Sequence, residues 1–325
     1  MSQPVPPGRS EPSPLPRVGW VPGPFLAGAL SLLVFGSLLA VPFLGVFTAM
    51  LASLPLLHSA ATGRPSILAW GWVAVMLAGV ALLADSLWLV AFLEGFLLVA
   101  AWPAVSVELW SRSRWPDGRW LTVVVLVAWA VAAASLMAVA APAHPAERLA
   151  RAMSAAASGS EAVMRQLLWG GRTSPEVMAA ALEGAAYLAP SAVAFYVAAV
   201  ALWVRSRLPA LGFAVGREPF HLVRAEEWLP VAFAVGGLGW VFAAGVAKWL
   251  AANLLVTVGG LYFVAGLAII HFYLGRRWGS NRWVRLAVLL FAVQVPVAVA
   301  VAVAGLVDGF FPLRRGAGWD EGSQA

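Results

Sequence analysis

The sequence has no cysteine and few charged residues. Without cysteine the chain can form no disulfide, no thiolate metal site and no thiol nucleophile. Charged residues make up only 11% of the 325 positions and hydrophobic residues 62%, a composition far outside the range of soluble proteins. Backbone amides in a bilayer must be satisfied within the protein, which leaves helices and closed barrels as spanning structures. Because the apolar runs are long and do not alternate, we predict an all-α, polytopic integral membrane helical bundle.

Motifs for catalysis and nucleotide binding are missing as well. The sequence has no phosphate-binding Gly-Lys-Ser/Thr loop, no His-Glu-x-x-His pair and no Gly-x-Ser-x-Gly elbow, and its four histidines are scattered. We therefore predict a protein that is not an enzyme, with no catalytic residue, metal or cofactor. The net charge of +6 does not indicate a nucleic-acid partner, because the arginines form short clusters between apolar runs, as topology determinants do.

The chain divides into a membrane domain and two polar tails. Residues 1–24 are rich in proline and poor in apolar residues, which predicts a disordered tail. Residues 25–311 form the predicted membrane domain, and residues 312–325 a polar C-terminal tail. Within the membrane domain, the segment 142–185 is too polar to span and is predicted to be an amphipathic segment outside the cytoplasm.

About eight or nine transmembrane helices are predicted. The first apolar run, from Phe25 to Leu57, is too long for one span of about 20 residues. Pro42 lies near its middle and predicts a break into helices 25–40 and 42–57, the second either spanning or re-entrant. The later predicted spans are 67–84, 87–107, 120–141, 186–204, 230–247, 250–273 and 286–307.

The arginine clusters predict the orientation of these spans. Most of the loops that carry them fall on one side, which should be cytoplasmic. The opposite side receives the Asp85 turn, segment 142–185, the Lys248 turn and the C-terminal tail. Tryptophans near predicted span ends are expected at the membrane interface. They include Trp110, Trp115, Trp120, Trp203, Trp228, Trp249 and Trp283.

Three stretches outside the spans also have a predicted structure. Apolar residues recur at near-helical spacing over 145–170, which predicts a helix lying on the membrane surface. Residues 173–176 combine a capping-box spacing with a first-turn proline, so a new helix should begin there. Residues 216–228 are predicted to form a short amphipathic helix on the cytoplasmic face.

Glu94 and Asn253 are the candidate substrate-binding residues. A charge at membrane depth costs about 2.5–3.5 kcal/mol, so Glu94 is a functional hypothesis by default. It could contact a substrate or carry a proton or cation, or it could be a carboxyl group bonded to a neighbouring helix. Asn253 could contact a ligand or bond another helix.

Four other polar residues lie within or beside the spans: Asp85, Lys248, His271 and Asp308. Lys248 is the only lysine, and its position at the junction of two spans predicts that it snorkels to the interface. His271 lies near the cytoplasmic end of its span and needs no special role. Asp308 ends the last span and could cap a helix or pair with Arg314.

The last third of the chain resembles a known family. The features that carry the resemblance are Arg224 and Trp228 before a span, Asn253 opening the next, the run 261–270, and Gly305-Leu306-Val307-Asp308 followed by Arg314. They resemble the YybS-like family of bacterial polytopic membrane proteins, a domain of unknown function (DUF2232). The chain departs from that family at Pro312, where an acidic residue is usual. The N-terminal half is similar in outline to the substrate-binding S components of energy-coupling-factor transporters.

Two functional hypotheses follow. The first is a small-molecule transporter or S-component-like subunit in the bacterial cytoplasmic membrane, with Glu94 and Asn253 facing a common cavity. The second is a non-enzymatic scaffold that recruits a protein partner through the arginine-rich cytoplasmic loops, including Arg217 and Arg224. In both, the lipid bilayer surrounds the protein.

Overall fold

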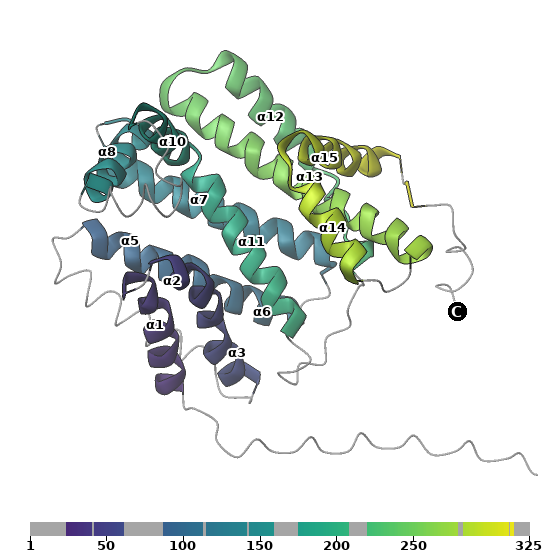
Figure 1. The fold of residues 1–325 in the computed structure, drawn as a ribbon, viewed down its shortest axis with the longest axis horizontal. Helices are drawn as coiled ribbons and strands as arrows, with labels where there is room; N and C mark the ends of the chain where they lie inside the picture. Colours follow the sequence, from purple (N-terminus) through teal and green to yellow (C-terminus); the bar gives the residue numbers. More distant parts are fainter. Residues whose placement is uncertain are drawn as a thin grey trace, which may run out of the picture.

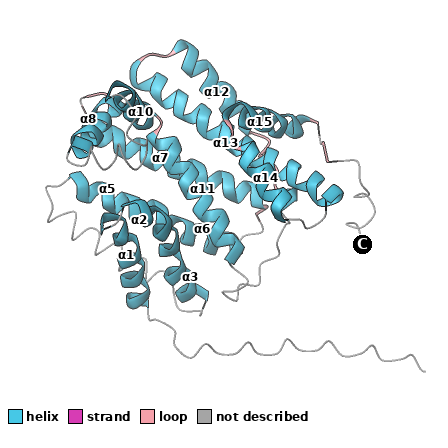
Figure 2. Cartoon of the chain, in the orientation of Figure 1, coloured by secondary structure: helices cyan, strands magenta, loops and turns pink. Residues whose placement is uncertain are grey.

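All regular structure in the described part of the chain is helical (Figures 1 and 2). The computed structural model describes residues 24–40, 42–61, 87–112, 115–141, 143–158, 175–207, 220–278, 282–311 and 313–314. The predicted all-α class is therefore confirmed for these residues. The predicted span 67–84, Asp85, and almost all of both predicted tails lie outside the described residues.

The first apolar run breaks at the predicted place. Helix α1 covers Pro24–Ala40 and α2 begins at Pro42, covering Pro42–Ala49. A short 3₁₀ turn, η1 (Met50–Ala52), leads into α3 (Ser53–Ala61). The returning chain packs on α1, and the Ser31 hydroxyl donates a hydrogen bond to the Ala52 carbonyl. Hydroxyl groups of this hairpin thus find partners within the protein, as a bilayer environment requires.

Four helices of the described part are long and apolar enough to cross a bilayer. They are the continuous segment Phe92–Trp110, α7 (Asp117–Ala140), α11 (Ala189–Arg207) and α13 (Gly245–Trp278). The first of these lies within a continuous helical stretch made of α5 (Leu87–Phe96), the π-helical turn η2 (Leu97–Ala101) and α6 (Trp102–Arg112). A bent helix pair adds a fifth candidate, while α12 (Leu229–Phe242) is shorter. The predicted count of eight or nine is not confirmed.

The segment predicted as one continuous span, 286–307, is broken. It forms two helices, α14 (Arg282–Ala292) and α15 (Val295–Phe310), bent by 96°. Pro296 lies in the first turn of α15, and its i−4 residue is Ala292, the last residue of α14. Proline has no amide hydrogen, and its ring clashes with the carbonyl four residues earlier, so a straight helix cannot continue through this point.

The bend reverses the predicted side of the chain's end. Arg314 donates to the carbonyls of His221 and Val223, in a segment predicted to lie on the arginine-rich side. Figure 1 shows α15 running back beside α13 toward the α13 C-terminus. The prediction that Arg314 lies on the opposite side is therefore wrong. We use "arginine-rich side" for the end of the bundle that holds Arg205, Arg224 and Arg276.

The predicted amphipathic helix at 216–228 is also wrong where the structure describes it. Residues Phe220–Leu222 form one 3₁₀ turn, η4, and no helix covers 223–226. A Cβ atom added to Gly118 would lie 2.0 Å from the carbonyl oxygen of Arg224, so this segment runs directly over the start of α7. Tertiary contacts with α7 and Arg314 thus override the local helical pattern.

Among the described residues, two helices lie between α7 and α11 in the sequence. They are α8 (Pro145–Ser158) and α10 (Pro175–Tyr187), and they pack against each other. The predicted helix start near residue 175 is confirmed, as is a helix beginning at residue 145. The remainder of the surface helix predicted over 145–170 lies outside the described residues.

The core contains three tryptophans that the sequence pattern assigns to the interface, one of which is Trp110, 4% exposed on α6. Trp120 on α7 is 2% exposed, and Trp249 on α13 is fully buried. Trp115, Trp228 and Trp283 are exposed, as an interfacial position requires. Position near a span end therefore does not distinguish a tryptophan facing lipid headgroups from one that packs against a neighbouring helix.

Candidate functional site

The helical path is interrupted between α10 and α11. Helix α10 ends at Tyr187, α11 begins at Ala189, and Pro190 has no amide hydrogen to donate. The Ser191 amide, which would bond to the Tyr187 carbonyl in a continuous helix, instead donates to Asn253 Oδ1 at 3.3 Å. The Tyr187 carbonyl oxygen is thereby free to accept other donors.

Two side chains of α13 supply those donors. Trp249 Nε1 donates to the Tyr187 carbonyl at 2.8 Å, and Asn253 Nδ2 donates to the same oxygen at 2.9 Å. Asn253 Nδ2 also donates to the Trp249 carbonyl at 3.0 Å. Buried backbone groups that a helix break leaves open need other partners, and Trp249 and Asn253 supply them here.

The same network extends further into the bundle. The Ser191 hydroxyl lies 2.9 Å from both Asn253 Oδ1 and the Asn253 carbonyl, and the Thr257 hydroxyl donates to it at 3.1 Å. Asn253 and Thr257 are fully buried. Both donor hydrogens of the Asn253 amide and its oxygen are used within the protein. In this structure Asn253 thus bonds another helix, which is one of the two roles predicted for it.

An open cavity of about 580 Å³ adjoins this break, between α8 and α10. Tyr187 lines this cavity together with side chains of both charges, among them Glu147, Arg151 and Glu183. Arg151 lies 3.9 Å from Glu147, one turn earlier on α8. His144 also lines the cavity, and its ring meets the Trp249 ring edge to face at 6.2 Å between centroids. The cavity is thus in contact with the buried network through His144 and Tyr187.

Glu94 lies elsewhere. It is half-buried on α5, with a side-chain hydrogen bond to Ser135 on α7. The π-helical turn η2 begins three residues later. Neither Glu94 nor Asn253 lines the cavity between α8 and α10. Their substrate-binding role stays a prediction.

The other sequence candidates have identifiable contacts. Lys248 is exposed, with its Nζ 6.0 Å from the centroid of the Trp240 ring, as an interfacial lysine would be. His271 is half-buried and stacks on His221 with ring centroids 6.3 Å apart. Asp85 lies outside the described residues.

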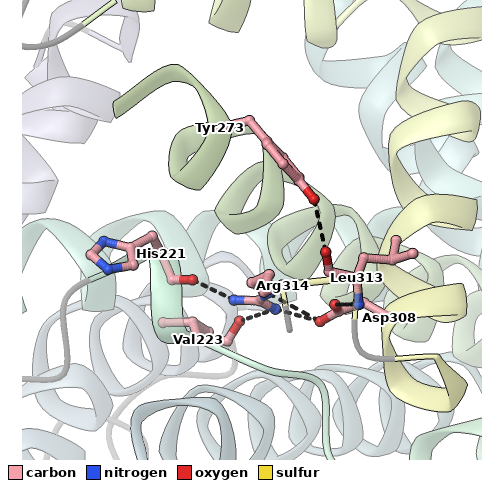
Figure 3. Close-up of polar contacts among 6 residues, drawn as sticks. All are labelled: His221, Val223, Tyr273, Asp308, Leu313 and Arg314. Atoms are coloured by element: carbon pink, nitrogen blue, oxygen red, sulfur yellow. Dashed lines mark hydrogen bonds and ion pairs between the residues drawn. The ribbon is translucent and has the colours of Figure 1, made fainter. Parts of the chain in front are cut away.

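Asp308 holds the segment that follows α15 and pairs with Arg314 (Figure 3). Its Oδ2 lies 2.6 Å from Arg314 Nη2, and its Oδ1 accepts the Leu313 amide at 2.9 Å. Both side chains are 4% exposed. The guanidinium also donates to the His221 carbonyl and, at 3.1 Å, to the Val223 carbonyl, while the Tyr273 hydroxyl donates to the Leu313 carbonyl at 2.7 Å. A buried charge pair needs such additional hydrogen bonds to offset its desolvation.

A second buried pair was not anticipated from the sequence. Asp117, the first residue of α7, forms an ion pair with Arg205 near the end of α11. Its side chain is 4% exposed, and the Arg205 guanidinium carbon lies 5.9 Å from the Trp110 ring centroid. A carboxylate at a helix N-terminus and an arginine at a helix C-terminus each complement a helix dipole. A carboxylate at a predicted helix start and an arginine at a predicted helix end are the signals in the sequence that indicate this pair.

The described residues thus form an all-helical bundle with four or five candidate membrane spans. A family model described as a predicted membrane protein (DUF2232) matches residues 28–309. The chain belongs to this family. No curated protein and no solved structure matches it.

Proposed function

We propose that this protein is a small-molecule transporter, or the substrate-binding membrane subunit of one. The observation that carries the proposal is the interrupted helix α10–α11, whose break lies beside a cavity with charged walls. Substrate sites of transporters commonly lie beside helix breaks. Here Trp249 and Asn253 hold the carbonyl freed by the break, so the ligand would be bound by the side chains that line the cavity. The volume of about 580 Å³ suits a metabolite-sized ligand.

The mixed charges of the lining support a polar ligand. Glu183 and Tyr187 come from α10, and His144, Glu147 and Arg151 from α8 or the residue just before it. A ligand that contacts both helices would bring them together across the cavity. Tyr187 would then pass a displacement to α13 through Trp249 and Asn253, which hold its carbonyl.

The proposal includes the finer predictions of location and family. We place the protein in the bacterial cytoplasmic membrane, with the cavity on the outer side, because the arginine-rich side favours the cytoplasm. The resemblance to YybS-like proteins and to S components of energy-coupling-factor transporters fits a subunit that binds substrate and relies on a separate ATPase.

Mass spectrometry of small molecules retained by the purified protein tests the proposal. We expect a polar metabolite to co-purify and to be lost from the variants His144→Ala and Glu183→Gln. Glu176→Gln is the matched control, since Glu176 is an exposed glutamate of the same helix that does not line the cavity. Retention of no molecule, or equal retention by Glu183→Gln and wild type, would contradict the proposal.

A scaffold is the second candidate, favoured by the exposed Arg224, Glu227 and Trp228 on the segment that crosses α7. Arg217 lies outside the described residues. This function predicts a co-purifying protein that is lost on Arg224→Ala and kept on Glu183→Gln. The reverse pattern would reject it.

A further inference from the structure

Among the described residues, the arginines near the start of α7, the end of α11 and segment 221–226 fall into two groups. Arg205 and Arg314 are neutralised by Asp117 and Asp308 and are largely or wholly buried. Arg119, Arg207 and Arg224 are exposed, and none of these three has an ion pair with a carboxylate among the described residues. The buried pairs therefore act within the fold, while the three exposed guanidinium groups remain available to an external anion.

Two of the exposed arginines stack on tryptophan. The Arg119 guanidinium carbon lies 5.3 Å from the Trp115 ring centroid, and that of Arg207 lies 5.5 Å from the Trp203 ring centroid. Trp115 is 42% exposed. Tryptophan favours the level of lipid headgroups, and stacking restricts the rotation of the guanidinium while leaving its N–H groups free to bind a phosphate. Arginine held in this way is suited to the phosphate of a lipid headgroup.

The three arginines come from elements that meet at one place. Arg119 follows Gly118, which lies against the backbone carbonyl of Arg224. Arg207 lies two residues beyond Arg205, which is paired to Asp117. The start of α7, the end of α11 and segment 223–226 are thus fixed to each other at Asp117 and Gly118. They hold three positive charges at one end of the bundle, with Glu226 and Glu227 following Arg224 in the chain.

We propose that Arg119, Arg207 and Arg224 form a binding site for the headgroup of an anionic phospholipid. The partner is a lipid rather than a soluble anion because the site lies at the end of membrane-spanning helices, beside an exposed tryptophan. This site is independent of the proposed transport function.

The test measures which phospholipid the full-length protein keeps. Purified protein is equilibrated in detergent micelles with equal amounts of phosphatidylglycerol and phosphatidylcholine, and bound lipids are counted by native mass spectrometry. We expect wild type to be enriched in phosphatidylglycerol. The enrichment should fall about fivefold for each arginine removed, since a basic residue near an anionic surface contributes on that order.

Arg119→Gln with Arg224→Gln is the informative double variant. Its matched control is Arg276→Gln with Arg277→Gln, which removes two exposed arginines from α13, a helix that contributes no residue to the proposed site. If the first double variant does not fold, as judged by its melting transition, Arg207→Gln alone still tests the site. Loss of enrichment in Arg119→Gln/Arg224→Gln, or in Arg207→Gln, with none in the control supports the proposal.

Four outcomes would overturn it. Wild type could show no preference for phosphatidylglycerol, or the control could lose as much as the test variant, which indicates net charge rather than a site. Displacement of the lipid by millimolar inorganic phosphate would indicate a site for free anions. A co-purifying acidic protein lost on Arg224→Ala, without lipid enrichment in wild type, would assign the surface to a protein partner.

Discussion

Asn253 on α13 and Ser191 on α11 are bonded through both side chain and backbone, although 62 residues separate them in the sequence. The pair lies where α10 ends and α11 begins, and it joins the broken helix to the longest helix of the described chain. Tyr187 also lines the cavity between α8 and α10, so this cavity borders the buried network.

Replacing Asn253 by leucine should destabilise the protein by about 1–3 kcal/mol, because it leaves the Ser191 amide and hydroxyl without their main partner in a buried site. Thermal unfolding in detergent measures the effect. Thr257→Val is the comparison, since it removes only the bond to the Ser191 hydroxyl and should cost less. An Asn253→Leu protein that melts with wild type would show that this network does not hold the helices together.

Removing Arg314 should be more costly. Arg314→Gln leaves Asp308 buried without its counter-charge, and breaking a buried pair from one side typically costs about 3–5 kcal/mol. Adding Asp308→Asn should restore part of the loss, because the second change removes the uncompensated charge. Melting temperatures of the two single variants and the double variant measure the coupling between the residues. Additive losses would argue against a direct pair.

The contact between α13 and α15 depends on glycine. A Cβ atom at Gly266 would lie 2.0 Å from the Val301 carbonyl oxygen, and one at Gly305 would lie 2.0 Å from that of Tyr262. Gly266→Ala and Gly305→Ala should therefore force the helices apart and lower the melting temperature. Gly309→Ala is the control, because a Cβ there meets nothing within 4 Å, and alanine should leave stability unchanged or raise it slightly.

The absence of cysteine allows a direct test of the corrected topology. Single cysteines at Arg277 and Phe311 should react with a membrane-impermeant maleimide from the same side of the membrane, and Ser154→Cys should react from the other. All three positions are exposed. Labelling of Phe311→Cys and Ser154→Cys from one common side would mean that the last helix crosses the bilayer, as the sequence pattern alone suggested.

Local chemistry predicted the helix boundaries better than it predicted the contacts between helices. Pro42 and Pro175 each begin a helix as expected, because a first-turn proline loses no hydrogen bond there. Pro296 also lies in the first turn of a helix. Because the residues on both sides of it are apolar, however, the sequence favours one continuous span. A proline inside an apolar run is consistent with either a kink or a complete break, and the choice depends on packing against α13.

The candidate site was only partly predictable. Asn253 was identified because a polar side chain inside an apolar run is rare, but its partners Ser191 and Tyr187 carry no unusual local signal. The walls of the cavity come from a polar segment between spans, where charged residues are ordinary. Asp308 and Arg314 were recognised as a possible pair because only six positions separate them, whereas Asp117 and Arg205 are 88 positions apart.

Helix α13 contains 34 residues and is therefore about 50 Å long. Near one end, Trp249 and Asn253 donate hydrogen bonds to the carbonyl of Tyr187, a residue that lines the cavity. Near the other end, the Tyr273 hydroxyl donates to the Leu313 carbonyl, next to Arg314. The close approach of Gly266 and Gly305 gives α15 little freedom to slide along it. The cavity end of the bundle and the arginine-rich side thus share one stiff rod, so a tilt imposed at the first becomes a sideways displacement at the second.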